Sequence, residues 1–278
     1  MPYRMLVVDL DGTLLRDDKT ISEENVRAIQ SAHECGLAIV LATGRPPVGA
    51  HHALSRLSPA ANEYLITYNG ALTTDLRTGR TMAVHELTRR NFDELAPYLQ
   101  QRDLYCYAFN RDTCLAPALH EIIQAEHAIN GIDTAIIDFS RMPPDEPLIK
   151  IMATGSPVQL DQVYRQLPAK WLSAYQIVQS APILMEFLSP LASKGQAVQD
   201  LCRHLGIGSQ EVICVGDAGN DTDMVSWAGL GVAMGNADES LRNLADHITD
   251  TNENHGIAQL IQRFVFPQDP CSTINLVP

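Results

Sequence analysis

Residues 5–13 read Met-Leu-Val-Val-Asp-Leu-Asp-Gly-Thr, and the interpretation of the whole chain starts from this stretch. The apolar run predicts a buried strand with Asp9 and Asp11 at its carboxyl end, followed by a turn at Gly12 and Thr13. Side chains two residues apart on a strand point the same way, so the two carboxylates repel and raise each other's pKa. A cation, most simply a metal ion, should therefore lie beside them. One carboxylate can then act as a nucleophile and the other as a proton carrier.

The segments on either side of this stretch alternate between strand and helix patterns. Ser22 can cap a helix that ends at Gly36, and residues 37–42 form an apolar run typical of a buried strand. Next come a helix over 46–57, a strand over 64–68 and a hairpin of 71–74 with 81–85. Late in the chain we expect helices over 193–205, 221–228, 237–245 and 256–265 and strands over 211–215 and 231–234. This order predicts an α/β fold with a doubly wound, mostly parallel Rossmann-like sheet.

Between residues 86 and 188 the pattern changes. We expect helices over 88–101, 117–129 and 158–167, strands over 104–110, 135–139 and 148–153, and a hairpin of 175–179 with 183–188. These elements indicate an inserted α+β domain over 86–188, which leaves 1–85 and 189–278 as one discontinuous core domain. The proline-containing tail after Phe266 is expected to be loosely attached.

Composition and charge exclude several kinds of partner. The chain has 278 residues, a formal net charge of −13 and a pI near 5.0, whereas nucleic-acid binding needs a cationic surface. No apolar stretch approaches the ~18 residues of a membrane span, and the chain enters its first strand without a signal peptide. The patterns around Cys35, Cys202 and Cys214 are typical of buried thiols, and no C-x-x-C pair occurs. We therefore expect a reducing, cytoplasmic location and no zinc site.

Four short segments stand at the ends of predicted strands or the starts of predicted helices. They are 9–13, Thr43-Gly44-Arg45, Ser193-Lys194-Gly195 and the run Gly-Asp-Ala-Gly-Asn-Asp at 216–221. Thr-Gly-Arg alone is a common loop, and Lys194 alone would most often be a solvated lysine. In an open α/β sheet, however, ligands bind beyond the carboxyl ends of the strands, and helix N-termini there present free N–H groups to an anion. We therefore expect the four segments to converge on one site.

In this order and spacing, the four segments resemble the motifs of the haloacid-dehalogenase-like hydrolase superfamily. The phrases "DLDGTLL", "TGRP", "YNGA" and "SKG", with a large insertion between the second and third motifs, resemble its Cof-type phosphatase branch. The resemblance runs over residues 1 to about 260. It implies a phosphatase that uses Mg²⁺, with residues 86–188 as a cap that closes over the substrate.

The resemblance also implies a role for each motif residue. Asp9 is the nucleophile that forms an aspartyl-phosphate, and Asp11 protonates the leaving alcohol and then activates water. Mg²⁺ is held by the carboxylates of Asp9 and Asp217 and by the backbone carbonyl of Asp11. The phosphoryl oxygens are bound by Thr43, Lys194, Asn220 and the backbone amides of Leu10 and Gly44. Asp221 orients Lys194 or a metal-bound water. Arg45 and Asn69 lie near the substrate. Because Asp11 must carry a proton, we expect its pKa to exceed that of an ordinary aspartate.

Three functions stay open at this point. The first is a phosphatase acting on small phosphorylated metabolites. The second is a phosphomutase or phosphotransferase, which differs only in what attacks the aspartyl-phosphate. The third is a non-catalytic phosphoaspartyl switch. Asp11 and the large insertion argue against it, because such a switch has no need of either. The expected partner is a small-molecule phosphate ester, with no nucleic acid or membrane, and sugar phosphates, pyridoxal phosphate and flavin mononucleotide all remain possible substrates.

Overall fold

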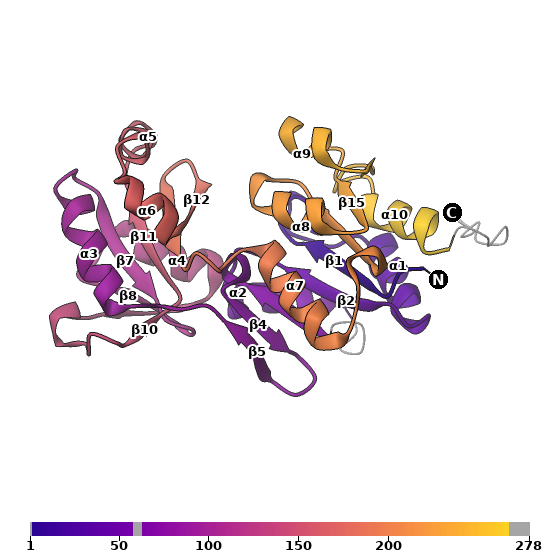
Figure 1. Ribbon diagram of the computed structural model, residues 1–278, viewed down its shortest axis with the longest axis horizontal. Coiled ribbons are helices and arrows are strands. Elements are labelled where there is room, and N and C mark those ends of the chain that lie inside the picture. Colours follow the sequence, from indigo (N-terminus) through magenta and orange to yellow (C-terminus); the bar gives the residue numbers. More distant parts are fainter. Residues whose placement is uncertain (1, 58–62, 267–278) are drawn as a thin grey trace.

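The computed structural model describes residues 2–57 and 63–266, which form two units side by side, each built on a sheet (Figure 1). The described part of the core has eight strands in the order β16-β15-β14-β1-β2-β3-β4-β5. These are β1 Met5–Asp9, β2 Ala38–Ala42, β3 Tyr64–Thr67, β4 Leu72–Asp75, β5 Arg80–Val84, β14 Val212–Gly216, β15 Leu230–Ala233 and β16 His247–Ile248. Its helices are α1 Glu23–Glu34, α2 Pro47–Arg56, α7 Lys194–Leu205, α8 Thr222–Trp227, α9 Glu239–Leu244 and α10 Gly256–Phe264.

Strand β1 lies at the centre of the core sheet, between β14 and β2, and is parallel to both. Met5, Leu6, Val7 and Val8 have no exposed surface, as expected for a parallel strand covered on both faces. The connection from β1 leads to β2 on one side of this centre, and the connection from β14 leads to β15 on the other side. Right-handed crossovers then place α1 and α8 on opposite faces of the sheet. The carboxyl ends of β1 and β14 therefore meet at a topological switch point, where such sheets bind ligands.

The cap is an α+β unit on a second sheet, which has the strand order β12-β13-β11-β7-β8-β9 in the described chain. Its strands are β7 Tyr105–Phe109, β8 Thr113–Ala116, β9 Asp133–Ile136, β11 Lys150–Thr154, β12 Gln176–Ala181 and β13 Leu184–Leu188, with β6 Leu87–Thr88 and β10 Pro147–Leu148 forming a separate pair. Its helices are α3 Arg89–Gln100, α4 Glu121–Asn130, α5 Pro157–Arg165 and α6 Ala169–Ala174.

The two faces of the cap sheet pack in different ways. Ile151, Ala153 and Phe187 point to one face and join a core cluster with side chains of α3, α5 and α6. Met152 and Leu188 point to the other face and share a cluster with residues 68, 71 and 72 of the core domain. The second face of the cap sheet is thus the one that looks toward the core.

These observations confirm the predicted α/β fold, with its mostly parallel doubly wound sheet and inserted α+β unit. The expectations for the cap were less accurate. Strand β8 and helix α6 were not predicted, because four- and six-residue elements leave little periodicity to read. The strand expected over 135–139 is β9 at Asp133–Ile136, and the helix expected from 117 begins at Glu121 after His120 caps it. The tail after Phe266 lies outside the described residues.

The prediction that Cys35 is buried is wrong. Cys35 is exposed because it follows the last turn of α1, whose buried stripe consists of Asn25, Val26, Ile29 and Ala32. Cys202 and Cys214 are buried free thiols, as expected, and so are Cys106 and Cys114. Among residues 2–57 and 63–266, no helix has the length and apolar character needed to cross a membrane.

Candidate active site

The four sequence segments do meet at the carboxyl edge of the core sheet. Asp9 is the last residue of β1, Thr43 follows β2 directly, and Asp217 follows β14. The turn after β1 needs a glycine, since Gly12 has φ +79° and a Cβ there would overlap the carboxylate of Asp217. Gly12 thus allows the first and fourth segments to pack against each other.

Lys194 lies between two carboxylates at the base of the site. Its Nζ donates to Oδ1 of Asp9 at 2.6 Å and to Oδ1 of Asp221 at 2.7 Å, and its side chain is only 1% exposed. Burial lowers the pKa of Lys194, but Asp221 and Asp9 outweigh this effect and hold it above its ordinary range. The lysine therefore stays charged, and its hydrogen bond to Asp221 is the contact that the first of the two expected roles of Asp221, orienting Lys194 or a metal-bound water, requires.

Three carboxylates gather around this lysine. Oxygens of Asp9, Asp217 and Asp221 lie within 4.8 Å of one another. Burial raises the pKa of Asp9 well above its ordinary value, Lys194 offsets part of this, and Asp221 and Asp217 raise it further. Burial and Asp221 also raise the pKa of Asp217 to about 6. A single lysine thus leaves the cluster short of positive charge.

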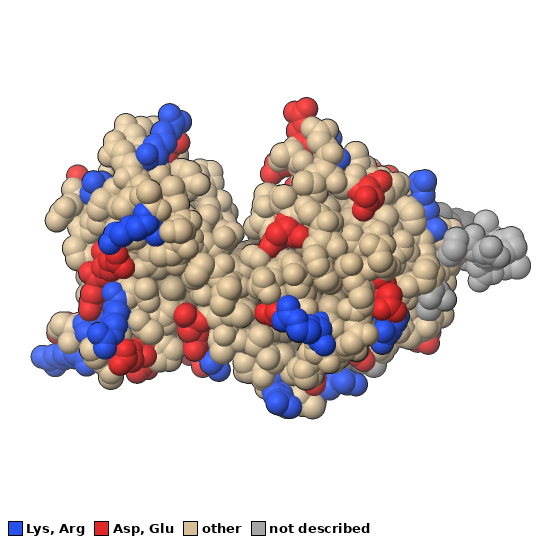
Figure 2. Space-filling view, viewed as in Figure 1, with Lys and Arg blue, Asp and Glu red and all other residues tan. Residues whose placement is uncertain are grey.

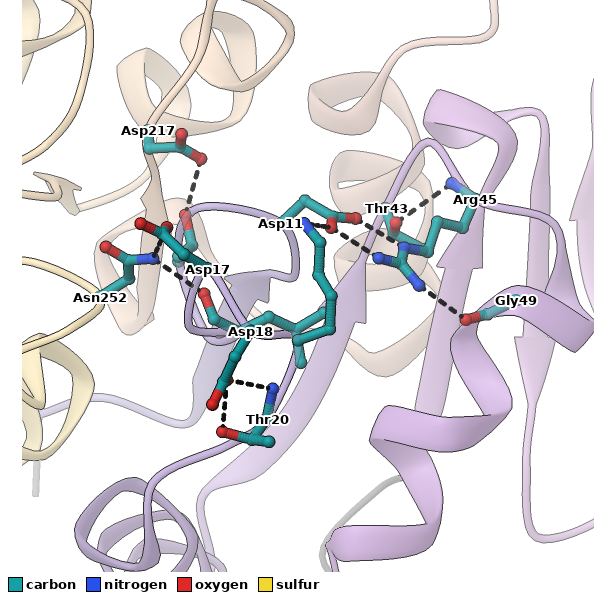
Figure 3. A network of polar contacts seen from close by, with 12 residues as sticks. Asp11, Asp17, Asp18, Thr20, Thr43, Arg45, Gly49, Asp217 and Asn252 are labelled. Atoms are coloured by element: carbon teal, nitrogen blue, oxygen red, sulfur yellow. Dashed lines mark hydrogen bonds and ion pairs between the residues drawn. The ribbon is translucent and has the colours of Figure 1, made fainter. Parts of the chain in front are cut away.

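Asp11 stands at the mouth of the site, where two cations bind it (Figure 3). Arg45 donates to both of its carboxylate oxygens at 2.6 Å, and Lys19 donates to Oδ1 at 2.9 Å. Burial raises the pKa of Asp11, but the hydrogen bonds and charges of Arg45 and Lys19 outweigh burial and lower it below its ordinary value. The expected elevation of this pKa is therefore wrong for this arrangement, because sequence spacing did not show that two cations would converge on Asp11.

The remaining predicted residues line the same site. The Asn220 side-chain amide donates to Oδ1 of Asn69 at 3.0 Å, and the absence of a side chain at Gly44 leaves room for that Asn69 oxygen. The Thr43 hydroxyl accepts the N–H of Arg45 at 3.1 Å. The side chain of Leu10 is fully buried, so only its backbone can serve a ligand.

Loops from distant parts of the chain hold these segments in place. The Thr13 hydroxyl donates to Oδ1 of Asp217 at 3.0 Å. The Asn252 side-chain amide donates to Asp17 (Figure 3) and to the carbonyl of Leu15. The Asn236 side-chain amide donates to the carbonyl of Gly12. The turn that carries Asp11 is therefore fixed by the loops around residues 236 and 252.

A cleft of about 850 Å³ opens above these groups, between the core and the cap. The space-filling view shows a notch between the two lobes of the molecule (Figure 2). The core side of the cleft includes Asp9, Asp11, Thr43, Gly44, Arg45, Asn69, Asp217 and Asn220. The cap side includes polar and apolar residues of α4, β11, β12 and β13. Most of the predicted site residues therefore line one cleft.

Sequence reasoning missed Lys19 as part of the site. Lys19 has a left-handed backbone, with φ 67°, in a turn closed by hydrogen bonds between Arg16 and Thr20. The polar run at 16–20 indicates a turn, but it does not show that the lysine folds back over Asp11. The hydroxyl contact from Thr13 to Asp217 was missed for the same reason, since it joins segments 204 residues apart.

Comparisons with known proteins agree with this geometry. The family model for haloacid dehalogenase-like hydrolases matches residues 6–261. A Bacillus subtilis protein named "Putative phosphatase YxeH" is 33% identical over 95% of this chain and 98% of its own length. A second B. subtilis relative, 5-amino-6-(5-phospho-D-ribitylamino)uracil phosphatase YcsE, is 27% identical over 94% of this chain and 96% of its own.

Solved structures show the same relationship. A haloacid dehalogenase-like hydrolase from Bacteroides thetaiotaomicron has a TM-score of 0.83 to this chain and 28% sequence identity, covering 94% of this chain and 99% of that one. The family match covers both the core and the cap, and all four motifs lie inside it. The chain therefore belongs to the family of haloacid dehalogenase-like hydrolases and is a phosphatase of that family.

Proposed function

We propose that the protein hydrolyses small phosphate monoesters through an aspartyl-phosphate on Asp9, with Mg²⁺ as its metal ion. The observation that carries this proposal is the buried carboxylate of Asp9, 2.6 Å from the ammonium of Lys194 on the floor of a cleft whose rim holds Asp11. A nucleophile with a fixed cation beside it and an acid/base group within the same cleft is the set of groups that this chemistry needs.

In the first step, an oxygen of Asp9 forms a bond to phosphorus while the ester P–O bond breaks. Asp11 gives its proton to the departing alkoxide, which leaves as an alcohol. In the second step, Asp11 takes a proton from water as the water oxygen bonds to phosphorus. The bond between Asp9 and phosphorus then breaks, which releases inorganic phosphate and restores both aspartates.

The chain's own residues fit a bound Mg²⁺. Three clustered carboxylates with one lysine leave negative charge uncompensated. Burial, and after it the charge of Asp221, raise the pKa of Asp217 to about 6. Hard carboxylate and carbonyl oxygens are the ligands that Mg²⁺ prefers. The carboxylates of Asp9 and Asp217 and the backbone carbonyl of Asp11 would hold it, while Asp221 is already engaged by Lys194 and by the amides of residues 217 and 218. When bound, the ion supplies positive charge beside the transferring phosphoryl group.

The other motif residues would bind and orient the phosphoryl group. Lys194, held by Asp221, places a fixed positive charge beside Asp9. We assign Thr43, Asn220 and the backbone amides of Leu10 and Gly44 to the phosphoryl oxygens. Arg45 and Asn69 are assigned to the substrate side of the same cleft. Phosphoryl transfer depends mainly on such positioning and charge stabilisation.

We assign residues 1–85 and 189–278 to the catalytic core domain and 86–188 to a cap domain that excludes water and contacts the organic part of the substrate. The buried thiols at Cys106, Cys114, Cys202 and Cys214 are free, which supports our inference of a reducing, cytoplasmic location.

The test of this function is a panel of phosphorylated metabolites, together with p-nitrophenyl phosphate, incubated with Mg²⁺. The proposal expects release of inorganic phosphate. Formation of an isomeric sugar phosphate, or transfer to an added alcohol without phosphate release, would instead identify a mutase or transferase. Stable phosphorylation of the protein without turnover would identify a phosphoaspartyl switch.

A further inference from the structure

The turn at residues 68–70 joins β3 to β4 and has an unusual backbone. Tyr68, Asn69 and Gly70 all have left-handed conformations, with φ of 52°, 54° and 96°. Glycine adopts this conformation freely, but it is unfavourable for a residue with a side chain, and most of all for a bulky one. Such a backbone persists only where the surrounding structure holds it, and it occurs most often at functional sites. The contacts of this turn therefore indicate what it does.

The turn binds two loops of the candidate active site. The N–H of Tyr68 donates to the carbonyl of Arg45 at 3.1 Å, and the N–H of Asn69 donates to the carbonyl of Thr43 at 3.0 Å. Oδ1 of Asn69 accepts the side-chain amide of Asn220 at 3.0 Å. A shift of the turn would therefore disturb the second and the fourth of the four site segments.

Gly70 places the same turn against the third segment. A Cβ at Gly70 would lie 2.1 Å from the carbonyl oxygen of Ser193 and 3.0 Å from the backbone nitrogen of Lys194, so only glycine fits there. Ser193 caps α7 and Lys194 is the first residue of that helix. The backbone of the turn is thus packed against three of the four site segments.

The side chain of Tyr68, in contrast, contacts the cap. Its hydroxyl donates at 3.1 Å to the carbonyl of Arg111, which lies in the turn between β7 and β8. The centroid of its ring is 6.2 Å from that of Phe109, the last residue of β7. The guanidinium of Arg111 binds Glu86 at 2.9 Å, where the chain passes from the core to the cap. Tyr68 therefore joins the turn to a part of the cap that is itself tied to the linker.

A buried ion pair of the cap provides another contact of this ring. Nζ of Lys150 lies 5.7 Å from the centroid of the Tyr68 ring, within the range of a cation–π interaction. Lys150 is bound to Glu186 with 3.2 Å between Nζ and Oε2, and the two side chains are only 7% and 4% exposed. Because the cap sheet holds this ammonium, the contact also ties the Tyr68 ring to the position of the cap.

We propose that Tyr68 is a positioning residue that couples the position of the cap to the geometry of the phosphoryl-binding site. This inference rests on the proposed phosphatase function. The cap holds the Tyr68 side chain, which keeps the left-handed turn in place, and the turn keeps Asn69 against Asn220. Tyr68 has no exposed surface, so it cannot contact a ligand in the cleft. Any effect of Tyr68 on ligand binding must therefore be indirect.

Tyr68→Phe tests this coupling, because it removes the hydroxyl that binds the Arg111 carbonyl and keeps the ring. Inorganic phosphate is the probe, since it has no organic part that could contact the cap. Its inhibition constant against p-nitrophenyl phosphate hydrolysis with Mg²⁺ should rise about three- to tenfold, as expected for the loss of one hydrogen bond. Lys19 and Arg45, which line the same cleft, keep their charges in this variant. A weaker affinity for phosphate would therefore not come from a change in charge.

Tyr98→Phe is the matched control. The Tyr98 hydroxyl also donates to a backbone carbonyl, that of Gln166 at 2.7 Å, but both residues belong to the cap and neither lines the cleft. This variant should leave the inhibition constant of phosphate unchanged. Thermal unfolding of both variants completes the comparison, because a purely structural role of Tyr68 would lower the unfolding temperature without changing the affinity for phosphate.

A double-mutant cycle tests the route through the turn. Asn69→Ala removes the hydrogen bond to Asn220, so a change at Tyr68 can no longer reach Asn220 in this way. In the Asn69→Ala background, Tyr68→Phe should raise the inhibition constant of phosphate less than about twofold, since the link is already lost.

The inference is overturned if Tyr68→Phe leaves the inhibition constant of phosphate unchanged, whether or not the unfolding temperature falls, or if Tyr98→Phe raises that constant equally. An undiminished effect of Tyr68→Phe in the Asn69→Ala background would also overturn it, because the effect would then take another route. Failure of the underlying function looks different. The wild-type protein would then release no phosphate from p-nitrophenyl phosphate with Mg²⁺ present, and this inference would fall with the function.

Discussion

Arg45 binds both carboxylate oxygens of Asp11, from Nε to Oδ2 and from Nη2 to Oδ1, each at 2.6 Å. A bidentate pair between a guanidinium and a carboxylate is a strong interaction, and it holds Asp11 in its ionised form. Arg45 is itself fixed by a hydrogen bond to the carbonyl of Gly49 on α2 (Figure 3). For Asp11 to give a proton to a leaving alcohol, Arg45 must release at least one of these oxygens.

The first prediction follows from this pair. Arg45 stabilises the carboxylate form of Asp11 and lowers its pKa. The substitution Arg45→Gln should therefore raise the pKa of Asp11, so that a larger fraction of Asp11 is protonated at a given pH. The pH above which aspartyl-phosphate formation from an alkyl phosphate slows should therefore move upward. Single-turnover rapid-quench measurements across pH check this. Arg56→Gln, which removes an exposed arginine of α2 paired with Glu23, should leave the profile unchanged. An unmoved profile in the Arg45 variant would show that Arg45 does not control the Asp11 proton.

The second prediction separates the two roles that we propose for Asp11, as the acid of the first step and the base of the second. An alkyl phosphate leaves as a basic alkoxide and needs a proton, whereas p-nitrophenolate leaves without one. Asp11→Asn should slow aspartyl-phosphate formation from a sugar phosphate by ~10²–10⁴-fold, and from p-nitrophenyl phosphate far less. Hydrolysis of the intermediate should slow for both substrates. Rapid-quench measurement of the first step gives the two losses, and equal losses would argue against an acid role for Asp11.

The third prediction concerns the metal ion. Treatment with EDTA should abolish phosphatase activity, because the Asp9, Asp217 and Asp221 cluster then lacks enough positive charge beside the nucleophile. Added Mg²⁺ should restore activity, and Ca²⁺ should inhibit it, because its larger and looser shell would misplace the carboxylate of Asp9. Phosphate release from p-nitrophenyl phosphate is the measurement. Full activity in metal-free protein would remove the ion from the mechanism.

The fourth prediction concerns Lys194. Lys194→Ala removes a charge needed for every substrate, so turnover should fall by ~10²–10³-fold across the whole panel without reordering preferences. The variant also leaves Asp9 and Asp221 buried and unpaired, which should lower the free energy of unfolding by about 3–5 kcal/mol in metal-free protein. Urea denaturation and a substrate panel measure both effects. Lys170→Ala, which breaks an exposed pair with Glu94, should cost at most about 1 kcal/mol. A changed substrate preference in Lys194→Ala would contradict this role.

The core sheet and the meeting of the candidate site segments could both be predicted from the apolar runs in the sequence. Apolar runs at 5–8, 37–42 and 212–215 are long enough to identify buried parallel strands, and the carboxyl ends of parallel strands must share one edge. Asp9, Thr43 and Asp217 follow those runs directly, so their meeting could be predicted without coordinates.

The charge pairs at the site could not be predicted in this way. Lys19 reaches Asp11 from a turn in which it has a left-handed backbone. Arg45 reaches Asp11 from the loop between β2 and α2, where the carbonyl of Gly49 also holds its guanidinium. Lys150 and Glu186 meet through the register of two antiparallel strands 36 residues apart, which periodicity does not specify. The pKa of Asp11 was expected to be high and is low because it depends on such contacts.

The most direct test of the proposed mechanism is to identify the residue that carries the phosphoryl group. Asp11→Asn is incubated with p-nitrophenyl phosphate and Mg²⁺ so that the intermediate accumulates, then quenched in acid, digested and mapped by mass spectrometry. Asp9→Asn serves as the control, since an amide is a poor nucleophile toward phosphorus. The proposed mechanism predicts one phosphorylated peptide, modified at Asp9 and missing in the control. A phosphoryl group on any other residue, or steady turnover by Asp9→Asn, would contradict it.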